Sequence, residues 1–298
     1  MGPLIDWALI AGSFLVAIVV GLTGMGGGAL MTPMMMLFFN VPPLAAVSSD
    51  LVASAVMKPV GGVVHLRRGT VTLRLVGWLC AGSVPAAFCG VFLARAFAVT
   101  DGVKYALGVA LLLAVAGMAV KSWLASRQEG GAASPREIVV RPIPTLLVGM
   151  VGGVVVGVSS VGSGSLIIVA LLVLYPALKA NQLVGTDLVQ AVPLVVSAAL
   201  GHLLFGDFRM DLTVSLLIGS IPGVYLGARI SSRAPGGLIR ALLAIVLLAS
   251  ALKLLGAGDA LTVGALAAAT LVTVTGWRLR VRAAARASSG STDLEPAR

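Results

Sequence analysis

The stretch Gly21-Leu-Thr-Gly-Met-Gly-Gly-Gly28 decides the fold, because it returns later in the chain as Gly157-Val-Ser-Ser-Val-Gly-Ser-Gly164. Further matches follow at nearly the same spacing: Asp50-Leu-Val with Asp187-Leu-Val, His65-Leu with His202-Leu, and Gly82-Ser-Val-Pro85 with Gly219-Ser-Ile-Pro222. Residues 50–90 align with residues 187–227 without a gap. A duplicated, glycine-broken apolar unit with polar residues at matched positions is typical of a secondary transporter.

The chain is far too apolar for a water-soluble protein. Of its 298 residues, 58% are hydrophobic and 11% are charged, whereas a soluble domain has about 25% charged residues. The mean hydropathy is +1.06. The apolar runs are continuous and longer than the alternating ~10-residue strands of a membrane β-barrel. The sequence therefore predicts an all-α, polytopic integral membrane protein, with the lipid bilayer as its surroundings.

The apolar runs divide the chain into two repeats and two polar segments. The runs fall at 4–22, 25–39, 44–66, 73–94, 103–123, 143–158, 164–175, 186–205, 212–230, 238–255 and 259–277. Those that flank the glycine-rich breaks are shorter than the ~20 residues of a full crossing, so each pair is either two tilted crossings or a re-entrant hairpin of half-helices. We expect a first transmembrane repeat at 1–123, a polar linker at 124–142, a second repeat with a final span at 143–277, and a basic, disordered tail at 278–298.

The basic residues indicate how the chain is oriented. The formal net charge is +10, and lysine and arginine accumulate on the cytoplasmic side of membrane proteins. Placing Arg67, Arg68 and Arg74 inside also puts the linker and the C-terminus in the cytoplasm, and leaves only a minority of basic residues outside: Arg95, Lys104, Arg209 and Lys253. The scattered charges lack the interleaved aromatic residues of a nucleic-acid surface, so no nucleic-acid partner is predicted.

The same orientation inverts the two halves relative to each other. The basic turn 65–69 lies inside, and its repeat partner, 202–206, has lost both arginines and lies outside. Inverted-topology repeats place a binding site near the midplane, where the broken helices meet.

The glycine-rich breaks are the first candidates for a binding site. Glycines permit positive φ angles and close approach, and the helix that follows each break presents free N–H groups and a positive dipole end. A small anion fits there. The predicted substrate-binding residues in the breaks are Thr23, Gly24, Gly26, Gly27, Gly28, Ser159, Ser160, Gly162, Ser163 and Gly164. The alternative is that these glycines only allow close helix packing.

Lys58 is the one basic residue predicted inside a span. A charged residue at that depth costs about 2.5–3.5 kcal/mol on insertion scales. Lys58 is therefore predicted to face an anion or an ion-pair partner, the alternative being that it snorkels to the interface. The second repeat has Val195 at the matched position, so this role is not symmetric.

Two matched pairs of titratable residues complete the candidate site. Asp50 and Asp187 lie near the starts of equivalent helices, where they either cap the helix or act as proton-coupling or gating carboxylates. His65 and His202 lie at the far ends of the same helices, as C-terminal caps, interface anchors or proton-coupling groups. No metal or other cofactor is predicted, because the chain has no HExxH motif and no cysteine pair.

These motifs resemble the TauE/SafE family of sulfite-exporter-type permeases. The resemblance runs over residues 5–277 and is carried by the first glycine-rich break, Ser48-Ser49-Asp50, His65-Leu-Arg-Arg-Gly69, Gly162-Ser-Gly164, Gly185-Thr-Asp187 and Gly201-His202. It implies a multi-span plasma-membrane or inner-membrane protein that moves small anions, among them sulfite, sulfoacetate and related organosulfur compounds. Ser163 departs from the pattern of the first break, which has Gly27 there.

Together the residues and the resemblance predict a permease rather than an enzyme. We expect it to carry a small anion, sulfite or a related organosulfur anion, by alternating access, with protons as a possible coupling ion. An anion channel is one alternative. An intramembrane enzyme or membrane assembly factor is another, although the sequence has no GxSxG motif and no paired catalytic carboxylates.

Overall fold

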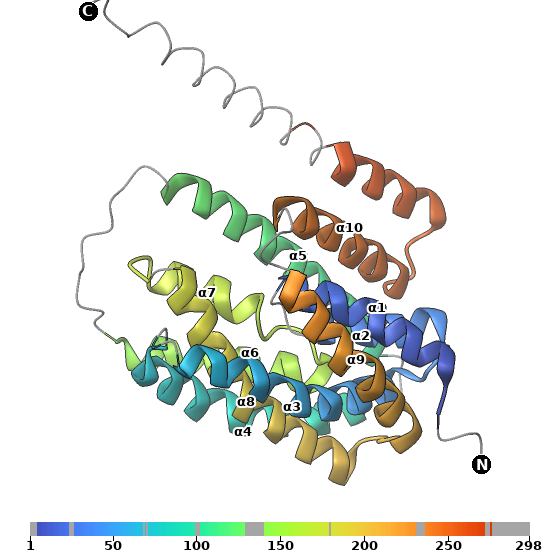
Figure 1. Cartoon of the computed structure of the whole chain (residues 1–298), viewed down its shortest axis with the longest axis horizontal. Helices are drawn as coiled ribbons and strands as arrows, with labels where there is room; N and C mark the ends of the chain where they lie inside the picture. Colours follow the sequence, from blue (N-terminus) through green and yellow to red (C-terminus); the bar gives the residue numbers. More distant parts are fainter. Residues whose placement is uncertain are drawn as a thin grey trace, which may run out of the picture. The chain divides into compact units, whose positions relative to one another are not determined.

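The chain folds into helices that follow the repeated apolar runs (Figure 1). The computed structural model describes residues 5–23, 27–67, 69, 71–98, 102–128, 140–178, 180–230, 236–271 and 275. Every regular element within these ranges is a helix, so the all-α prediction is confirmed. Residues 1–255 form one unit, and residues 256–298 form a second that contains the helix Asp259–Leu271.

The helices of the first unit form two series with the same order of long and short elements. The first series is α1 (Trp7–Thr23), α2 (Gly28–Phe38), α3 (Pro43–Arg67), α4 (Leu73–Ala98) and α5 (Gly102–Gln128). The second series is α6 (Pro142–Ser159), α7 (Leu166–Leu174), α8 (Ala180–Phe205), α9 (Met210–Ile230) and α10 (Gly236–Leu254). In each series the glycine-rich break separates the first helix from a short second one, which has 11 residues in α2 and 9 in α7.

Several of these helices are long and apolar enough to cross a bilayer. Among the described residues, the five that qualify by length and composition are Leu73–Ala98, Gly102–Val120, Pro142–Ser159, Gln182–Phe205 and Met210–Gly227. Large apolar side chains such as Leu73, Tyr105, Val151, Leu204 and Tyr225 are exposed along them. Lipid-facing side chains explain this exposure, because hydrocarbon solvates them as well as a protein core does.

Two seams of small residues join the two series. Gly149, Gly153 and Gly157 of α6 lie on the backbone of α4, next to the carbonyls of Leu79, Ser83 and Ala87. Gly219, Gly223 and Gly227 of α9 lie in the same way on α1, next to the carbonyls of Ile10, Phe14 and Ile18. In both seams the glycines recur every fourth residue and the two helices run parallel. Glycine at this spacing lets helix backbones approach closely in a membrane.

The pairing of helices is reciprocal between the two series. α1 packs on α9 as α6 packs on α4, while α3 packs on its own counterpart α8 and α5 on α10 (Figure 1). α3 and α8 run antiparallel, since Ser48 near the start of α3 contacts His202 near the end of α8. Gly62, near the end of α3, meets Val192 in the middle of α8. Two repeat-related helices therefore pack on each other in opposite directions.

Some predictions concern segments that the structure describes only in part. α5 continues to Gln128, into the first residues of the predicted linker. The rest of that linker up to residue 139 lies outside the described residues, and so does the predicted tail at 278–298. Pro85 and Pro222 lie inside α4 and α9.

Candidate functional site

One face of α3 carries a stripe of polar residues through the centre of the first unit. Asp50, Ser54 and Lys58 are spaced four residues apart, so they share one side of the helix. Asp50 is 1% exposed and Ser54 is 3% exposed, and Lys58 is half-buried. We call these three residues the α3 stripe. Polar groups buried inside a membrane protein are costly, and they mark functional sites by default.

The first glycine-rich break lies against the middle of this stripe. A Cβ atom at Gly27 would lie 4.0 Å from the hydroxyl of Ser54. One turn into α2, the Thr32 hydroxyl donates a 3.1 Å hydrogen bond to Oδ2 of Asp50. Thr32 is fully buried, so the contact is shielded from solvent. The first break and the helix after it therefore contact both Ser54 and Asp50.

The second break reaches the same stripe from the other half of the chain. Ser160 ends α6 in a left-handed conformation with φ of 59°, and its hydroxyl donates a 2.5 Å hydrogen bond to Oδ2 of Asp50. Lys58 Nζ donates a 2.6 Å hydrogen bond to the hydroxyl of Ser163. Asp50 and Lys58, both in the first half, thus bind residues of the second half.

The two breaks also contact each other directly. A Cβ atom at Gly28 would overlap the backbone carbonyl of Ser160, so only glycine fits at this position without a shift of one break. The sequence predicts that the broken helices meet, and in the first unit they do.

The other predicted residues of the second break shape its backbone. The Ser159 hydroxyl donates to the carbonyl of Val155 at 2.6 Å and accepts from the amide of Val161 at 3.2 Å. Gly162 and Gly164 have φ angles of 125° and 102°, which side chains rarely tolerate. These three residues therefore hold the turn between α6 and α7. Gly24, Gly26 and the side chain of Thr23 lie outside the described residues.

Asp187 occupies the position in α8 that Asp50 occupies in α3. It is 2% exposed. Both carboxylates attract the Lys58 ammonium. Asp50 lies on the same helix as Lys58, and Asp187 lies on the adjacent helix α8. The Thr186 hydroxyl next to Asp187 accepts a 3.1 Å hydrogen bond from the amide of Thr72, the residue directly before α4.

His202 is fully buried in the last turn of α8. Its Nε2 lies 2.8 Å from the carbonyl of Gly157. Because a carbonyl only accepts, Nε2 must carry a proton and donate it. Its Nδ1 lies 2.8 Å from the Ser48 hydroxyl of α3. His202 thus ties α8 to α3 and to the end of α6, and the side chain of His65 lies outside the described residues.

Sequence reasoning missed two residues of the site, Thr32 and Ser54. Ser54 had a usable signal, because it lies midway between Asp50 and Lys58 at helical spacing. Thr32 had none, since only the packing of α2 on α3 brings it to Asp50. The sequence also did not indicate the buried pair formed by Gln190 and Ser83, whose side chains are joined by a 2.9 Å hydrogen bond.

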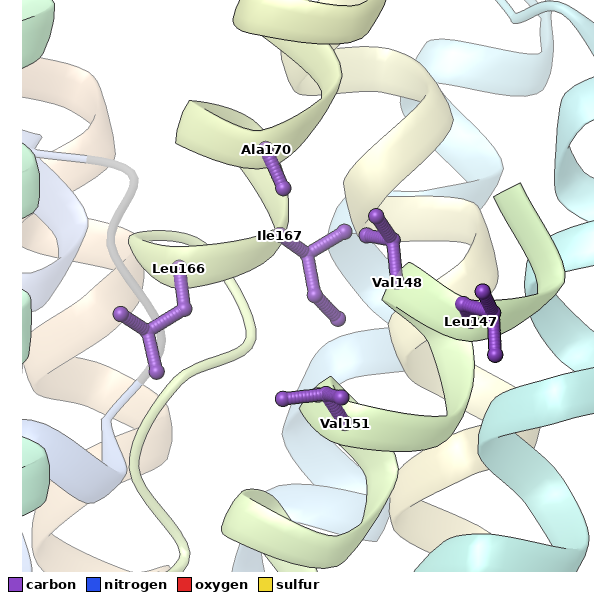
Figure 2. Close-up of a pocket in the computed structure, with 7 residues that line it drawn as sticks. Leu147, Val148, Val151, Leu166, Ile167 and Ala170 are labelled. Atoms are coloured by element: carbon purple, nitrogen blue, oxygen red, sulfur yellow. The ribbon is translucent and has the colours of Figure 1, made fainter. Parts of the chain in front are cut away.

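A separate apolar cavity of about 270 Å³ lies between α6 and α7 (Figure 2). Figure 2 shows Leu147, Val148 and Val151 of α6 facing Ile167 and Ala170 of α7. Leu147 and Val151 are more than half exposed, which places the cavity at the outer surface of the first unit. Its lining offers an anion no charged or hydroxyl side chain.

The apolar helices and the buried polar site are those of a multi-pass membrane protein, and comparison with known proteins identifies its class as a membrane transporter. The chain belongs to the TauE/SafE family, because the family model described as "Sulfite exporter TauE/SafE" matches residues 9–254. The resemblance stated from the motifs is therefore confirmed.

The relatives of the chain are named as transporters as well. The chain is 34% identical over 253 residues to "Probable membrane transporter protein YjnA" of Bacillus subtilis (strain 168), covering 83% of this chain and 99% of that relative. It is 25% identical over 223 residues to "Probable membrane transporter protein YdhB" of the same organism, covering 74% and 89%. These names indicate a transporter rather than an enzyme. No solved structure matches the chain significantly.

Proposed function

We propose that this transporter is a permease for a small oxyanion, sulfite or a related organosulfur anion, that works by alternating access. The observation that carries the proposal is the hydrogen bond from Lys58 Nζ to Ser163. It places the ammonium of one half against the break of the other half. Lys58 and the hydroxyl of Ser163, which accepts from Lys58 and keeps its own proton, offer hydrogen-bond donors to an anion, and the family description names sulfite.

The position of Lys58 supports an anionic substrate on energetic grounds. An ammonium inside a membrane span costs about 2.5–3.5 kcal/mol on insertion scales. Asp50 and Asp187 offset part of this cost, and Ser163 accepts one hydrogen bond from the ammonium. An ammonium has three donors, so an anion can accept a further charge-assisted hydrogen bond at this point of α3.

The arrangement of helices supports inverted repeats. Two repeat-related helices that run antiparallel are related by an axis perpendicular to both of them. If α3 and α8 cross the membrane, that axis lies in the membrane plane, as in inverted-topology transporters. This agrees with the expectation, from the distribution of basic residues, that the linker and the C-terminus lie in the cytoplasm. Movement of one half against the other would then open the site to alternate sides.

Asp50, Asp187, His65 and His202 are proposed to couple protons or to gate the pathway. For Asp50 the support is its pair of hydrogen bonds, one from Thr32 in its own half and one from Ser160 in the other half. A carboxylate that holds the two breaks together is suited to releasing them when it gains a proton or a substrate competes for its donors.

The test is sulfite flux into proteoliposomes, with sulfate as the comparison anion and with or without an imposed pH gradient. Wild type is compared with Lys58→Ala and Asp50→Asn, and with Lys104→Ala as a control, because Lys104 is an exposed lysine of α5. We expect saturable sulfite flux that Lys58→Ala reduces at least tenfold, that loses its dependence on the gradient in Asp50→Asn, and that Lys104→Ala leaves unchanged.

Each other outcome has a definite meaning. Sulfite flux that survives Lys58→Ala and Asp50→Asn would keep the permease but move the site away from α3. Flux that never saturates, and shows no counterflow, would favour the anion channel instead. Folded protein that carries no sulfite would overturn the substrate assignment.

A further inference from the structure

We propose that His202 and Ser48 form a proton-binding site, in which the His202 imidazole carries two protons and a positive charge in this conformation. The inference rests on the proposed function for what the proton does, and it deepens that function by selecting one atom, Nδ1 of His202, among the groups proposed to couple protons. Nε2 of His202 already carries a proton, because it donates to the Gly157 carbonyl at 2.8 Å. The state of Nδ1 therefore decides the charge of the ring.

The contacts of the Ser48 hydroxyl determine the state of Nδ1. The hydroxyl oxygen lies 2.7 Å from the Leu44 carbonyl, 2.8 Å from His202 Nδ1 and 3.3 Å from the amide nitrogen of Asp207. The carbonyl only accepts and the amide only donates, whereas a hydroxyl donates one proton and accepts at two lone pairs. If Nδ1 has no proton, the Leu44 carbonyl and Nδ1 compete for the single hydroxyl proton. If Nδ1 has a proton, the hydroxyl accepts from Nδ1 and Asp207 and donates to Leu44, so every contact is satisfied.

The burial of both side chains makes this difference important. Ser48 and His202 are both fully buried, so bulk solvent does not supply a second donor. A buried acceptor without a donor is costly, and nearly all buried polar groups are hydrogen-bonded. Hydrogen bonds from a charged donor are also stronger than those between neutral groups. The charged imidazole is thus favoured by the hydrogen bonds at both of its nitrogens.

Two helix ends supply negative potential at the imidazole. His202 lies in the last turn of α8, and the carbonyl that it contacts belongs to Gly157, in the last turn of α6. The last four carbonyls of a helix have no partner within that helix, and the C-terminal end of the helix dipole attracts cations such as imidazolium. Because two such ends meet at one side chain, they offset part of the cost of burying its charge.

The charged groups on the neighbouring elements are compatible with a positive ring. At this end of the packed helices the titratable or charged groups are Asp50 of α3, Cys89 and Arg95 of α4, Asp207 and Arg209 between α8 and α9, and Asp211 of α9. Asp207 and Arg209 pair with each other at 3.8 Å, and Cys89 and Arg95 are exposed. Asp187 lies about four turns earlier in α8. The buried charge at this end is therefore Asp50, and a carboxylate favours a positive imidazole.

The repeat does not supply this site twice. At the spacing that matches Asp50 with Asp187, the residue that matches Ser48 is Gly185. Glycine has no hydroxyl, so the sequence offers His65 no counterpart of Ser48. We therefore expect one proton site of this kind, at His202.

A proton at His202 would act on the contact between the two halves of the chain. Ser48 belongs to α3 in the first half, whereas His202 and Gly157 belong to α8 and α6 in the second. Loss of the proton leaves two acceptors for one hydroxyl proton and so weakens the contact between α3 and α8. Gly157 also lies one turn before Ser160, whose hydroxyl bonds Asp50. The proton is thus placed to bias the contacts that hold the two breaks together.

The test is NMR spectroscopy of the purified full-length protein with nitrogen-labelled histidine. The chain has two histidines, so two pairs of ring-nitrogen signals are expected, and either His65→Gln or His202→Gln assigns them. The chemical shift of a ring nitrogen reports whether that nitrogen carries a proton. We expect both nitrogens of His202 to carry protons at about pH 5.5, and Nδ1 to lose its proton reversibly as the pH rises to about 8, the range in which histidine changes its charge.

Two serine variants test the role of the hydroxyl. Ser48→Ala removes the acceptor for the proton on Nδ1, so the pH at which His202 is half protonated should fall by about one unit or more. Ser197→Ala is the matched control, because it removes a hydroxyl of the same helix α8 that bonds the Val84 carbonyl instead, and it should not move the titration. If Ser48→Ala does not fold, the titration of His202 in wild type decides the inference.

A pair of matched histidine variants tests what the proton does. His202→Gln keeps an amide donor for the Gly157 carbonyl but cannot take up a proton, so sulfite flux into proteoliposomes should lose its dependence on the pH gradient. His65→Gln makes the same substitution at the repeat partner, and flux should keep that dependence.

The outcomes distinguish this inference from the proposed function. Nδ1 without a proton down to about pH 5 in the folded protein, or a titration that Ser48→Ala does not move, would overturn the inference, while gradient-dependent flux would still support the permease. Titration of His202 in a protein whose flux ignores the gradient would support the proton site and reject proton coupling. Gradient-dependent flux that survives His202→Gln would overturn the part of this site in coupling.

Discussion

Gly28 and Ser160 place the two glycine-rich breaks in backbone contact. Gly28 opens α2 in the first half, and Ser160 closes α6 in the second. A Cβ atom at Gly28 would overlap the main-chain carbonyl of Ser160. The contact is thus between two backbones, and neither side can relieve an overlap by changing a rotamer.

Gly28→Ala should therefore destabilise the protein strongly. Overpacking a filled site costs about 1–3 kcal/mol and more where the backbone must move. We expect a clearly lower Tm for the purified protein, measured by the loss of its monodisperse peak after heating. Gly77→Ala in α4 is the control, because a Cβ atom there meets nothing within 4 Å. Equal Tm values for the two variants would show that the breaks do not touch.

The two glycine seams should respond alike, since they occupy equivalent places in the two series. A Cβ atom at Gly153 of α6 would overlap the carbonyl of Ser83, and one at Gly223 of α9 would lie 2.7 Å from Cβ of Ala17. We expect Gly153→Ala and Gly223→Ala each to lower the Tm, because close packing of small residues joins these helices. Gly264→Ala, which meets nothing within 4 Å, should leave it unchanged. A lower Tm in only one of these two variants would argue against the equivalence of the two seams.

Thr32→Val should destabilise the protein through Asp50. The substitution keeps the shape of the side chain but removes the donor that bonds Oδ2 of Asp50 at 3.1 Å. Hydrogen bonds to charged groups contribute about 1.5–3 kcal/mol, so the Tm should fall. In an Asp50→Asn background Thr32→Val should lower the Tm by less, because the acceptor of the hydrogen bond is no longer charged. Additive Tm changes would mean that the two residues act independently.

Replacing His202 should destabilise the protein more than replacing Ser48, whose hydroxyl contacts its imidazole. His202→Ala leaves a cavity and deprives the Gly157 carbonyl and the Ser48 hydroxyl of a partner. Ser48→Ala leaves a much smaller space, although it removes the contacts of the hydroxyl with His202, the Leu44 carbonyl and the Asp207 amide. Core truncations to alanine typically cost 2–5 kcal/mol, so His202→Ala should give the lower Tm. Both substitutions remove the same contact between His202 and Ser48, so the fall in Tm of the double variant should be smaller than the sum of the two single falls. A Tm for His202→Ala equal to wild type would contradict the buried, bonded position.

The helices themselves were predictable because their signal is local. Each apolar run of the sequence became a helix within a few residues, from 4–22 (Trp7–Thr23) to 259–277, where Asp259–Leu271 is described. The breaks were predictable for the same reason, since several glycines in a row interrupt a helix wherever they occur. The repeated motifs, such as Asp50-Leu-Val and Asp187-Leu-Val, predicted two series of helices.

The contacts between helices were not predictable, because they depend on which faces meet. The repeat pairs Asp50 with Asp187 in the sequence, but in the structure Asp50 binds Ser160 and Thr32 instead. The spacing of Lys58 within its span predicted a buried partner, and only the packing of α3 on the second break identifies it as Ser163. Glycines 219, 223 and 227 signal a close seam, but nothing in their spacing selects α1 as its other side.

The two glycine seams also have a consequence for how the chain is made. Each seam joins a helix of one series to a helix of the other, α1 to α9 and α4 to α6. When the ribosome has released only the first series, both α1 and α4 are in the bilayer without the helices that cover them. The close packing of α1 on α9 can therefore form only after α9 is synthesised. An unduplicated ancestor could have closed the same seams only by pairing two copies of itself.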